Sequence, residues 1–291
     1  MSVYQLKNNE LNVKVNSFGA ELSSVFSLKN NIEYIWQANP EIWPRHAPHL
    51  FPIVGKLKDG SFNVLNNTYQ LPQHGFARDN DFESIECSEN SLTFELKAND
   101  ETLKQFPFDF SLKINYTLLE NKLITSYEIF NPGSNELYFS IGAHPAFNCP
   151  LQKDESFMDY SLVFPKKNEL VINTLHEGLI KKETKTLTLN NNKLSVSKSL
   201  FDNDALVFMN SQIEQISLIS EKTSHGVTME CFNWPFFGIW TKNNYEQFIC
   251  LEPWQGIADS ETDECDFKNK KGIITLLPKQ KFNCSFNIIC F

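Results

Sequence analysis

Long apolar runs are missing from this sequence of 291 residues. No stretch approaches the roughly 20 apolar residues that a membrane-spanning helix requires. The N-terminal segment 1–25 also lacks the basic region and long apolar stretch that mark a signal peptide. These two absences predict a cytoplasmic protein with no membrane partner.

Basic residues are scarce relative to acidic ones. The chain has 26 Lys and Arg against 35 Asp and Glu, which gives a formal net charge of −9. A nucleic-acid partner is not expected, because such proteins carry a basic patch or an overall basic domain. An anionic membrane surface would repel a protein of this charge.

Motifs of short spacing that bind metals or phosphates are absent as well. The seven cysteines are scattered, and no two of them form a CxxC pair. In a reducing compartment each is expected to be a small buried apolar residue with a free thiol. No glycine-rich phosphate loop is present either.

Aromatic residues and short alternating segments dominate what is there. The chain contains 25 Phe, 8 Tyr and 5 Trp, and segments such as NELNVKVNSF, SLTFELKA and QISLIS alternate apolar with polar residues. Segment 114–131 predicts a hairpin that turns at Glu120 and Asn121, and a short turn or helix is expected in 99–108. The pattern predicts an all-β fold, a large antiparallel β-sandwich, in a single domain over 1–291.

Three segments place a titratable side chain at the edge of an apolar run. They are QLPQHGFARDNDFE with His74 and Arg78, YFSIGAHPAFNCP with His144, and FICLEPWQGIADS with Glu252. Burial in CLEPW would raise the pKa of Glu252 toward the range useful to a general base. Two histidines and one glutamate suffice for acid–base chemistry at neutral pH.

Structural roles for the same residues remain open at this point. His144 can be a core histidine satisfied by one backbone hydrogen bond, His74 can cap a turn, and Glu252 can pair with Arg78. The three can also form a metal site of two histidines and one carboxylate. Against a metal, the histidines lie far apart and lack the i, i+4 spacing of zinc motifs.

The motifs HGFAR, GAHPAF and LEPW, in this order, resemble those of the aldose 1-epimerases, the galactose mutarotase superfamily. The resemblance is closest to its LacX-type branch, and it extends to SFGAELSSV, IWPRHAPHLFPIVGKLKDGSF and NWPFFGIWTK. It implies a galactose mutarotase-like supersandwich with an open sugar groove. It also implies an isomerase that interconverts the α and β anomers of a hexose without a metal or cofactor.

The resemblance further implies roles for individual residues. Glu252 is the expected base, His144 the expected acid, and His74 the expected hydrogen-bond donor to the ring oxygen or a neighbouring hydroxyl. The expected substrate-binding residues are Lys56, Arg78, Asp204, Trp254 and Arg45. Lys56 stands where family members that act on neutral hexoses usually carry an arginine.

Two smaller choices accompany this assignment. Asp204 is preferred over Asp202 as the aspartate that binds sugar hydroxyls. Trp36, Trp43, Trp240 and Trp254 can each stack on a sugar face, although core packing is the commoner role of a tryptophan.

Two alternative functions stay open. Neutral hexoses such as glucose or galactose are the first expectation, but local positive charge on Arg45, Lys56, Lys58 and Arg78 would suit a hexose-6-phosphate 1-epimerase. Alternatively, Arg45 and Arg78 pair with nearby carboxylates. The other alternative is a non-catalytic carbohydrate-binding or sugar-sensing protein on the same fold. In every case the expected partner is a small sugar or sugar phosphate, and a homodimer is compatible with the sequence.

Overall fold

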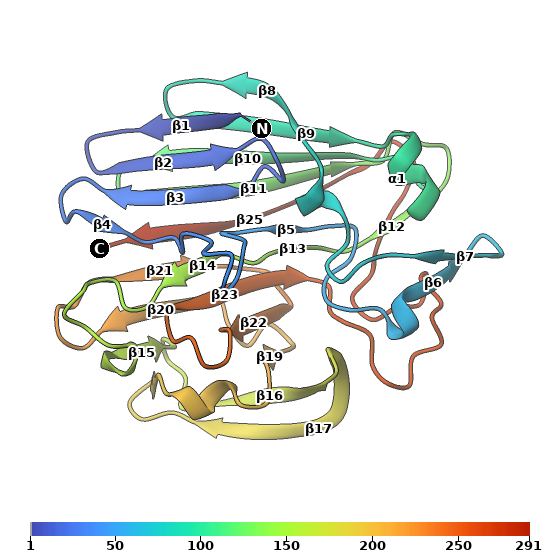
Figure 1. The fold of residues 1–291 in the computed structure, drawn as a ribbon. Coiled ribbons are helices and arrows are strands. Elements are labelled where there is room, and N and C mark those ends of the chain that lie inside the picture. Colours follow the sequence, from blue (N-terminus) through green and yellow to red (C-terminus); the bar gives the residue numbers. More distant parts are fainter. Residues whose placement is uncertain (1) are drawn as a thin grey trace.

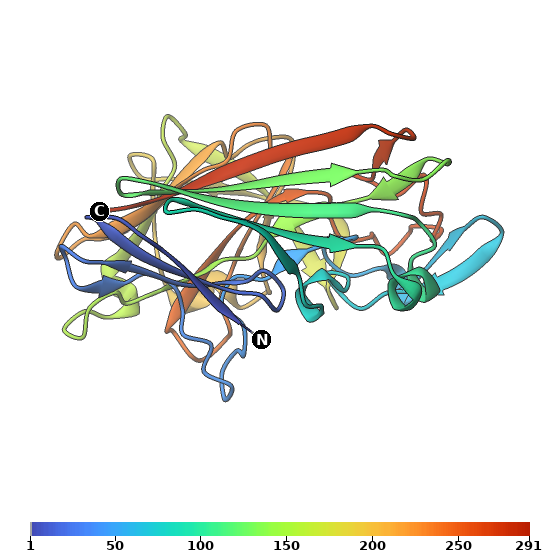
Figure 2. The same cartoon turned by 90° about the horizontal axis from the view of Figure 1, so that it is seen from above.

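Two large antiparallel sheets organise the chain in the computed structural model, which describes residues 2–291. The first sheet has nine strands, in the order β18 (Lys193–Ser195), β15 (Tyr160–Val163), β20 (Gln215–Ser220), β21 (Gly226–Glu230), β25 (Lys281–Cys290), β11 (Lys122–Phe130), β10 (Ser111–Leu119), β9 (Ser91–Lys97) and β8 (Glu83–Cys87). Its long strands run side by side (Figures 1 and 2).

The second large sheet carries the candidate site. It runs in the order β17 (Leu179–Thr188), β16 (Glu169–His176), β19 (Leu206–Phe208), β22 (Phe236–Trp240), β23 (Phe248–Gln255), β13 (Ile141–Ala143) and β5 (His49–Leu50), and β14 (Ala146–Asn148) also pairs with β23. Strand β23 lies inside this sheet and is buried along almost its whole length.

Smaller elements complete the fold. One further sheet contains β1 (Val3–Lys7), β2 (Leu11–Asn16), β3 (Leu22–Ser27) and β4 (Ile32–Glu33), while β6 (Ser61–Val64) pairs with β7 (Asn67–Gln70) and β12 (Leu137–Phe139) with β24 (Ile274–Leu276). The helical segments are α1 (Asp100–Gln105) and four short 3₁₀ turns, Lys58–Gly60, Ala77–Asp79, Phe157–Asp159 and Lys198–Phe201. The predicted all-β fold of large antiparallel sheets is confirmed.

Local predictions hold where the sequence signal is strong. Strands β10 and β11 pair in register from Ser111 with Phe130 to Leu119 with Lys122, and the turn contains Glu120 at φ 52°. The predicted short helix is α1, whose first turn is capped by Asn99. No helix in residues 2–291 is long and apolar enough to cross a membrane.

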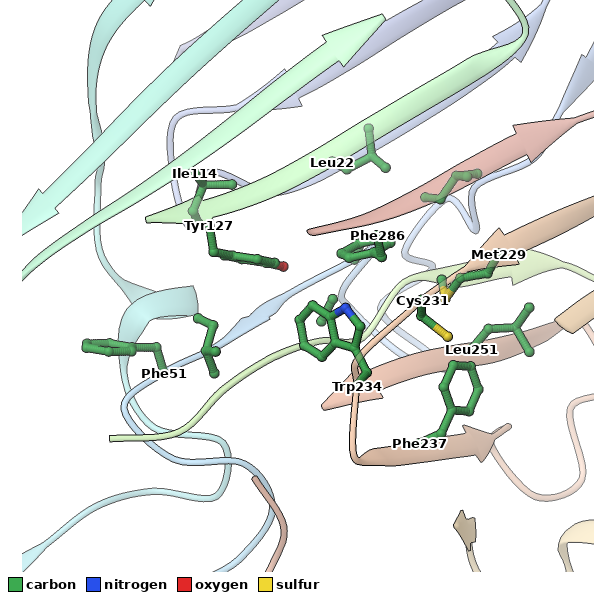
Figure 3. Close-up of a cluster of buried hydrophobic side chains, with 14 of the residues drawn as sticks. Leu22, Phe51, Ile114, Tyr127, Met229, Cys231, Trp234, Phe237, Leu251 and Phe286 are labelled. Atoms are coloured by element: carbon green, nitrogen blue, oxygen red, sulfur yellow. The ribbon is translucent and has the colours of Figure 1, made fainter. Parts of the chain in front are cut away.

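The main core lies between the sheets. Tyr127 from β11 and Phe286 from β25 pack near Trp234, and Leu251 and Phe237 from the second large sheet belong to the same buried cluster (Figure 3). Because side chains alternate along a strand, β23 presents Ile249 and Leu251 to this core and its even-numbered residues to the opposite face.

The cysteines depart in part from the expectation of burial. All seven are free thiols, but Cys87 is exposed, and Cys265 and Cys284 are only partly buried. Cys87 lies on β8, the edge strand of the nine-stranded sheet, where one side of the strand has no neighbour among the described residues.

Candidate active site

Strand β23 supplies the carboxylate of the site. Cys250, Glu252 and Trp254 share the face of β23 that points away from the inter-sheet core. Glu252 is only 1% exposed. One of its oxygens, Oε2, is buried without a hydrogen-bond partner among the described residues. A buried acceptor of this kind is costly to leave unpaired, and it points to a ligand or water in the pocket.

His144 follows directly after β13. Its backbone N–H donates to the carbonyl of Pro48 (3.1 Å), and Trp43 stacks on the imidazole with 5.1 Å between ring centroids. The imidazole Nε2 lies 3.2 Å from Glu252 Oε2. The core-histidine alternative does not describe this arrangement, because Nδ1 is buried and unpaired among residues 2–291 while the ring lines a pocket beside the carboxylate.

His74 enters the site from a turn of unusual backbone conformation. Its φ is 68°, which is costly for a residue other than glycine, and Gly75 follows at φ 70°. A Cβ at Gly75 would lie 2.3 Å from the carbonyl oxygen of Phe51, so only glycine fits there.

Gly55 fixes the tautomer of His74. The backbone N–H of Gly55 donates to His74 Nδ1 (3.1 Å), and the N–H of His74 donates to the Gly55 carbonyl (2.8 Å). Because Nδ1 accepts, the neutral ring carries its hydrogen on Nε2. With this tautomer the Gln73 side-chain nitrogen, 3.3 Å from Nε2, is a second donor and cannot accept from His74. The His74 ring stands perpendicular to the ring of His144. His74 is therefore a hydrogen-bond donor in the pocket.

Trp254 lies over two glycines of the neighbouring strands. A Cβ on Gly238 of β22 would approach the indole ring to 2.4 Å, and a Cβ on Gly142 of β13 would approach it to 2.9 Å. The indole thus fills the space that side chains would take at these positions. Its Nε1 is buried without a hydrogen-bond partner in the described part of the chain. This donor and the Glu252 acceptor are the polar groups that a hydroxyl-rich ligand would satisfy.

One pocket brings these groups together. Its lining includes Glu252, His144, His74, Asp204 and Trp254. The empty space is about 510 Å³, counting the part that opens to solvent. A pocket with apolar walls and a few convergent polar groups is the usual form of a small-molecule site.

Burial dominates the electrostatics of this pocket. It lowers the pKa of His144 to about 3 and that of His74 well below its ordinary value, and the charges of Arg78 and Arg45 act in the same direction. Burial also raises the pKa of Glu252 well above its ordinary value, and the charge of Asp204 adds to this shift. The nearby indole N–H of Trp254 opposes it, although the two groups are not aligned for a hydrogen bond. Burial therefore favours the neutral forms of both imidazoles and of the carboxyl group.

Three predicted binding residues lie beside the pocket and not in its lining. Arg45 pairs with Asp79 (2.9 Å), and Arg78 donates from Nη2 to the Gln73 carbonyl (2.6 Å). Lys56 donates from Nζ to the carbonyl of Glu177 (3.1 Å). Protein groups engage one donor of each cation, and direct contact of these cations with the substrate stays a prediction.

Asp204, the preferred aspartate, does line the pocket, at φ 72°. Asp202 ends the 3₁₀ turn Lys198–Phe201 and lies in a different surface hollow, beside Lys198 and Asn244. Of the two aspartates after Phe201, only Asp204 therefore reaches the pocket.

The tryptophans divide between the two roles considered for them. Trp240 and Trp254 line the pocket. Trp36 is buried against Phe248 with ring centroids 5.0 Å apart, so core packing accounts for it. Trp43 is only partly buried and stacks on both Phe248 (5.4 Å) and His144.

The hairpin of β16 and β17 is a part of the site that the sequence did not indicate. Its polar residues predict a solvated hairpin, yet Leu175, Gly178 and Ile180 line the pocket. The sequence feature that could have indicated this contact is the pair of apolar residues, Leu175 and Ile180, on either side of Gly178 at the hairpin tip. Gln73, next to His74, was missed as well.

The donor atoms near the pocket do not form the two-histidine, one-carboxylate set. Among the described residues, the side chains whose donor atoms lie within 4.8 Å of one another are His144, Cys250 and Glu252, without His74. Burial raises the pKa of Cys250 well above its ordinary value, as it does for Glu252. A cation bound there would have to displace the protons that these shifts favour on the thiol and the carboxyl.

Comparison with known proteins identifies the family. The family model described as Aldose 1-epimerase matches residues 2–288. The chain belongs to the aldose 1-epimerase family. It is also 33% identical over 293 residues to the chromosomal protein LacX of Lactococcus lactis subsp. lactis, with 98% of each chain covered. This places it in the LacX-type branch.

Solved structures agree with the assignment to the aldose 1-epimerase family. A galactose mutarotase related enzyme from Lactobacillus acidophilus is 35% identical, with a TM-score of 0.95, covering 100% of this chain and 97% of that one. A galactose mutarotase-like protein from Lactobacillus casei is 30% identical, with a TM-score of 0.91 and full coverage of both chains. These neighbours support the galactose mutarotase-like β-sandwich.

Proposed function

We propose that this member of the aldose 1-epimerase family is an isomerase that interconverts the α and β anomers of a hexose. The observation that carries the proposal is the pair of His144 and Glu252. Their reactive atoms lie 3.2 Å apart, in a pocket that also holds the His74 donor and the unpaired polar atoms of Glu252 and Trp254. A binding protein would not need an acid and a base in contact.

The reaction requires two coupled proton transfers. A base removes the proton from the anomeric hydroxyl, an acid protonates the ring oxygen, and the bond between C1 and the ring oxygen breaks to give the open aldehyde. Rotation about C1–C2 presents the other face of the aldehyde. Closure of the ring then reverses both transfers and leaves the enzyme unchanged.

Glu252 and His144 share the proton that this cycle needs. In the empty pocket the proton lies on Glu252, because burial raises the pKa of the carboxyl and lowers that of the imidazole. Sugar hydroxyls that donate to the carboxylate stabilise its charged form and allow the proton to pass to His144 Nε2. The pair then consists of a carboxylate base and an imidazolium acid.

The remaining pocket residues orient the sugar. His74 Nε2–H donates to the ring oxygen or a neighbouring hydroxyl and stabilises the charge that develops there. Asp204 accepts from hydroxyl groups, and the indole of Trp254 offers both an apolar surface and an unpaired N–H. None of these roles requires a cofactor.

Polarimetry of freshly dissolved α-glucose and α-galactose tests the proposal. The rotation should reach its equilibrium value faster with the protein than without it, in proportion to the protein concentration. Sugar binding, seen by calorimetry, without any acceleration for either sugar would favour the carbohydrate-binding alternative.

A second candidate, a hexose-6-phosphate 1-epimerase, is favoured by one observation. Burial lowers the pKa of Arg78 to about 10, and the positive charge of the neighbouring Arg45 contributes to this shift. The negative charge of Asp79 offsets only part of the decrease in pKa. The Nε of Arg78 is buried without a hydrogen-bond partner among the described residues, and Asp79 Oδ2 lies 3.8 Å from it. If an anion binds there, Arg78→Ala should raise KM for the phosphorylated sugar far more than for the free sugar. Equal shifts would remove this candidate.

A further inference from the structure

A buried ion pair lies behind one wall of the pocket. Asp259 Oδ1 is 2.6 Å from Lys270 Nζ, and the two side chains are only 4% and 3% exposed. The same ammonium group donates to the carbonyl of Ile257 (2.6 Å). Ile257 and Ala258, the residues just before Asp259, line the pocket, whereas the carboxylate of Asp259 does not.

Asp259 joins three separate segments of the chain. Its backbone N–H donates to the carbonyl of Lys56 (2.9 Å), and its Oδ2 accepts from the N–H of Lys58 (2.9 Å). Its carbonyl accepts from the N–H of Ile180 on β17 (2.8 Å). The first segment continues from Gly55, which holds His74, and Ile180 lines the pocket at the hairpin.

We infer that the Asp259–Lys270 pair is a positioning pair that fixes this wall of the pocket and so determines how tightly the sugar is held. The inference depends on the proposed function for its kinetic consequence. A buried ion pair is weak evidence for stability, because its desolvation offsets much of its attraction. Here the pair also binds backbone groups: Asp259 accepts from the N–H of Lys58, and Lys270 donates to the carbonyl of Ile257. If two apolar side chains replaced the pair, these buried backbone groups would lose their hydrogen-bond partners.

The catalytic pair has other supports. Glu252 lies within β23, between β22 and β13, and His144 is held through its N–H to Pro48. Loss of the Asp259–Lys270 pair should therefore loosen the wall that holds His74 and Ile180 more than it disturbs the acid–base contact. KM should rise more than kcat falls.

Hydrogen exchange tests the positioning role without any substrate. In Lys270→Met, the amides of Ile180 and Lys58 should exchange about tenfold faster than in the wild-type protein, while amides in the β10–β11 hairpin keep their rates. KM for the preferred sugar should rise about tenfold, with kcat within about threefold. Lys122→Met, which removes the Lys122–Glu230 pair (3.0 Å) of the other large sheet, is the matched control and should leave KM and both amides unaffected.

A double variant covers the case in which Lys270→Met does not fold. The double variant Asp259→Asn with Lys270→Met removes both charges but keeps an oxygen that can accept from the N–H of Lys58. In this variant the amide hydrogen of Ile180 should still exchange faster than in the wild-type protein. Uniform acceleration across the molecule, or no acceleration at Ile180, would show that the pair serves stability alone. An inactive wild-type protein would contradict the proposed function, while the exchange rates would still decide the positioning role.

Discussion

At the scale of single residues, burial determines the chemistry of the site. Burial raises the pKa of Glu252 and lowers the pKa of His144 to about 3, so the pocket favours the neutral form of both groups. The same effect acts on His49, a core histidine outside the pocket. Its ring contacts the hydroxyls of Tyr127 (2.7 Å) and Tyr116 (2.6 Å), and burial lowers its pKa to about 4.

His49 provides a test of this effect on stability. Its pKa is lower in the folded than in the unfolded protein, so the unfolded state binds the extra proton below about pH 6.5, and the stability of the folded state falls as the pH drops toward 4. Between pH 7 and pH 5 this contribution amounts to about 2 kcal/mol. Urea titration at pH 7 and pH 5 gives the free energy of unfolding that each protein loses over this range. The loss in His49→Gln should be about 2 kcal/mol smaller than the loss in the wild-type protein. An equal loss in variant and wild type would contradict the assignment of a neutral His49.

At the scale of elements, the site depends on how neighbouring strands meet. Trp254 of β23 can lie flat only because Gly142 of β13 and Gly238 of β22 have no side chains beneath it. The tip of the β16–β17 hairpin reaches the pocket and is held there by Lys56 and Asp259. The contact of Trp254 with Gly142 and the contacts that hold the hairpin tip join segments that are distant in sequence. Gly238 lies on β22, the strand just before β23.

Gly238→Ala should displace Trp254. The added methyl group would lie 2.4 Å from the indole, so we expect a loss of about 1–3 kcal/mol in the free energy of unfolding and a marked loss of sugar binding. The control is the same substitution in a Trp254→Phe background, where the smaller ring leaves room for the methyl group. Urea unfolding measures the loss of unfolding free energy in both backgrounds. A similar loss in both would show that the added methyl group destabilises another part of β22 and not the contact with Trp254.

Lys56→Met should release the hairpin tip. Because Lys56 Nζ binds the Glu177 carbonyl, its removal should weaken the binding of free and phosphorylated sugars by similar factors, about threefold to tenfold in KM. The measurement is KM for glucose and glucose 6-phosphate side by side. A selective loss for the phosphorylated sugar would instead make Lys56 a phosphate ligand.

At the scale of the whole molecule, sequence reasoning reached the fold class and three central residues of the candidate site. Period-two alternation predicted the antiparallel sheets and the β10–β11 hairpin, and the three motifs placed Glu252, His144 and His74 in one groove. The role of the β16–β17 hairpin was not predictable, because its polar sequence is typical of a solvated turn and its contacts to the pocket are tertiary backbone hydrogen bonds. That Arg45 pairs with a nearby carboxylate was one of the alternatives, but its partner, Asp79, depends on two loops meeting in space.

The proposed chemistry uses only side chains of this chain. Exhaustive dialysis against a chelator is therefore expected to leave the rate of mutarotation unchanged. Loss of activity that zinc alone restores would show that a metal takes part and would revise the roles of Glu252 and His144.

The central claim is that Glu252 and His144 exchange a proton with the anomeric centre. The most direct test is the polarimetric rate for Glu252→Gln, which keeps the shape of the side chain but cannot act as a base. We expect kcat to fall by about 10²–10⁴, with a modest change in KM and an unchanged fold by circular dichroism. A rate within about threefold of the wild type would contradict it.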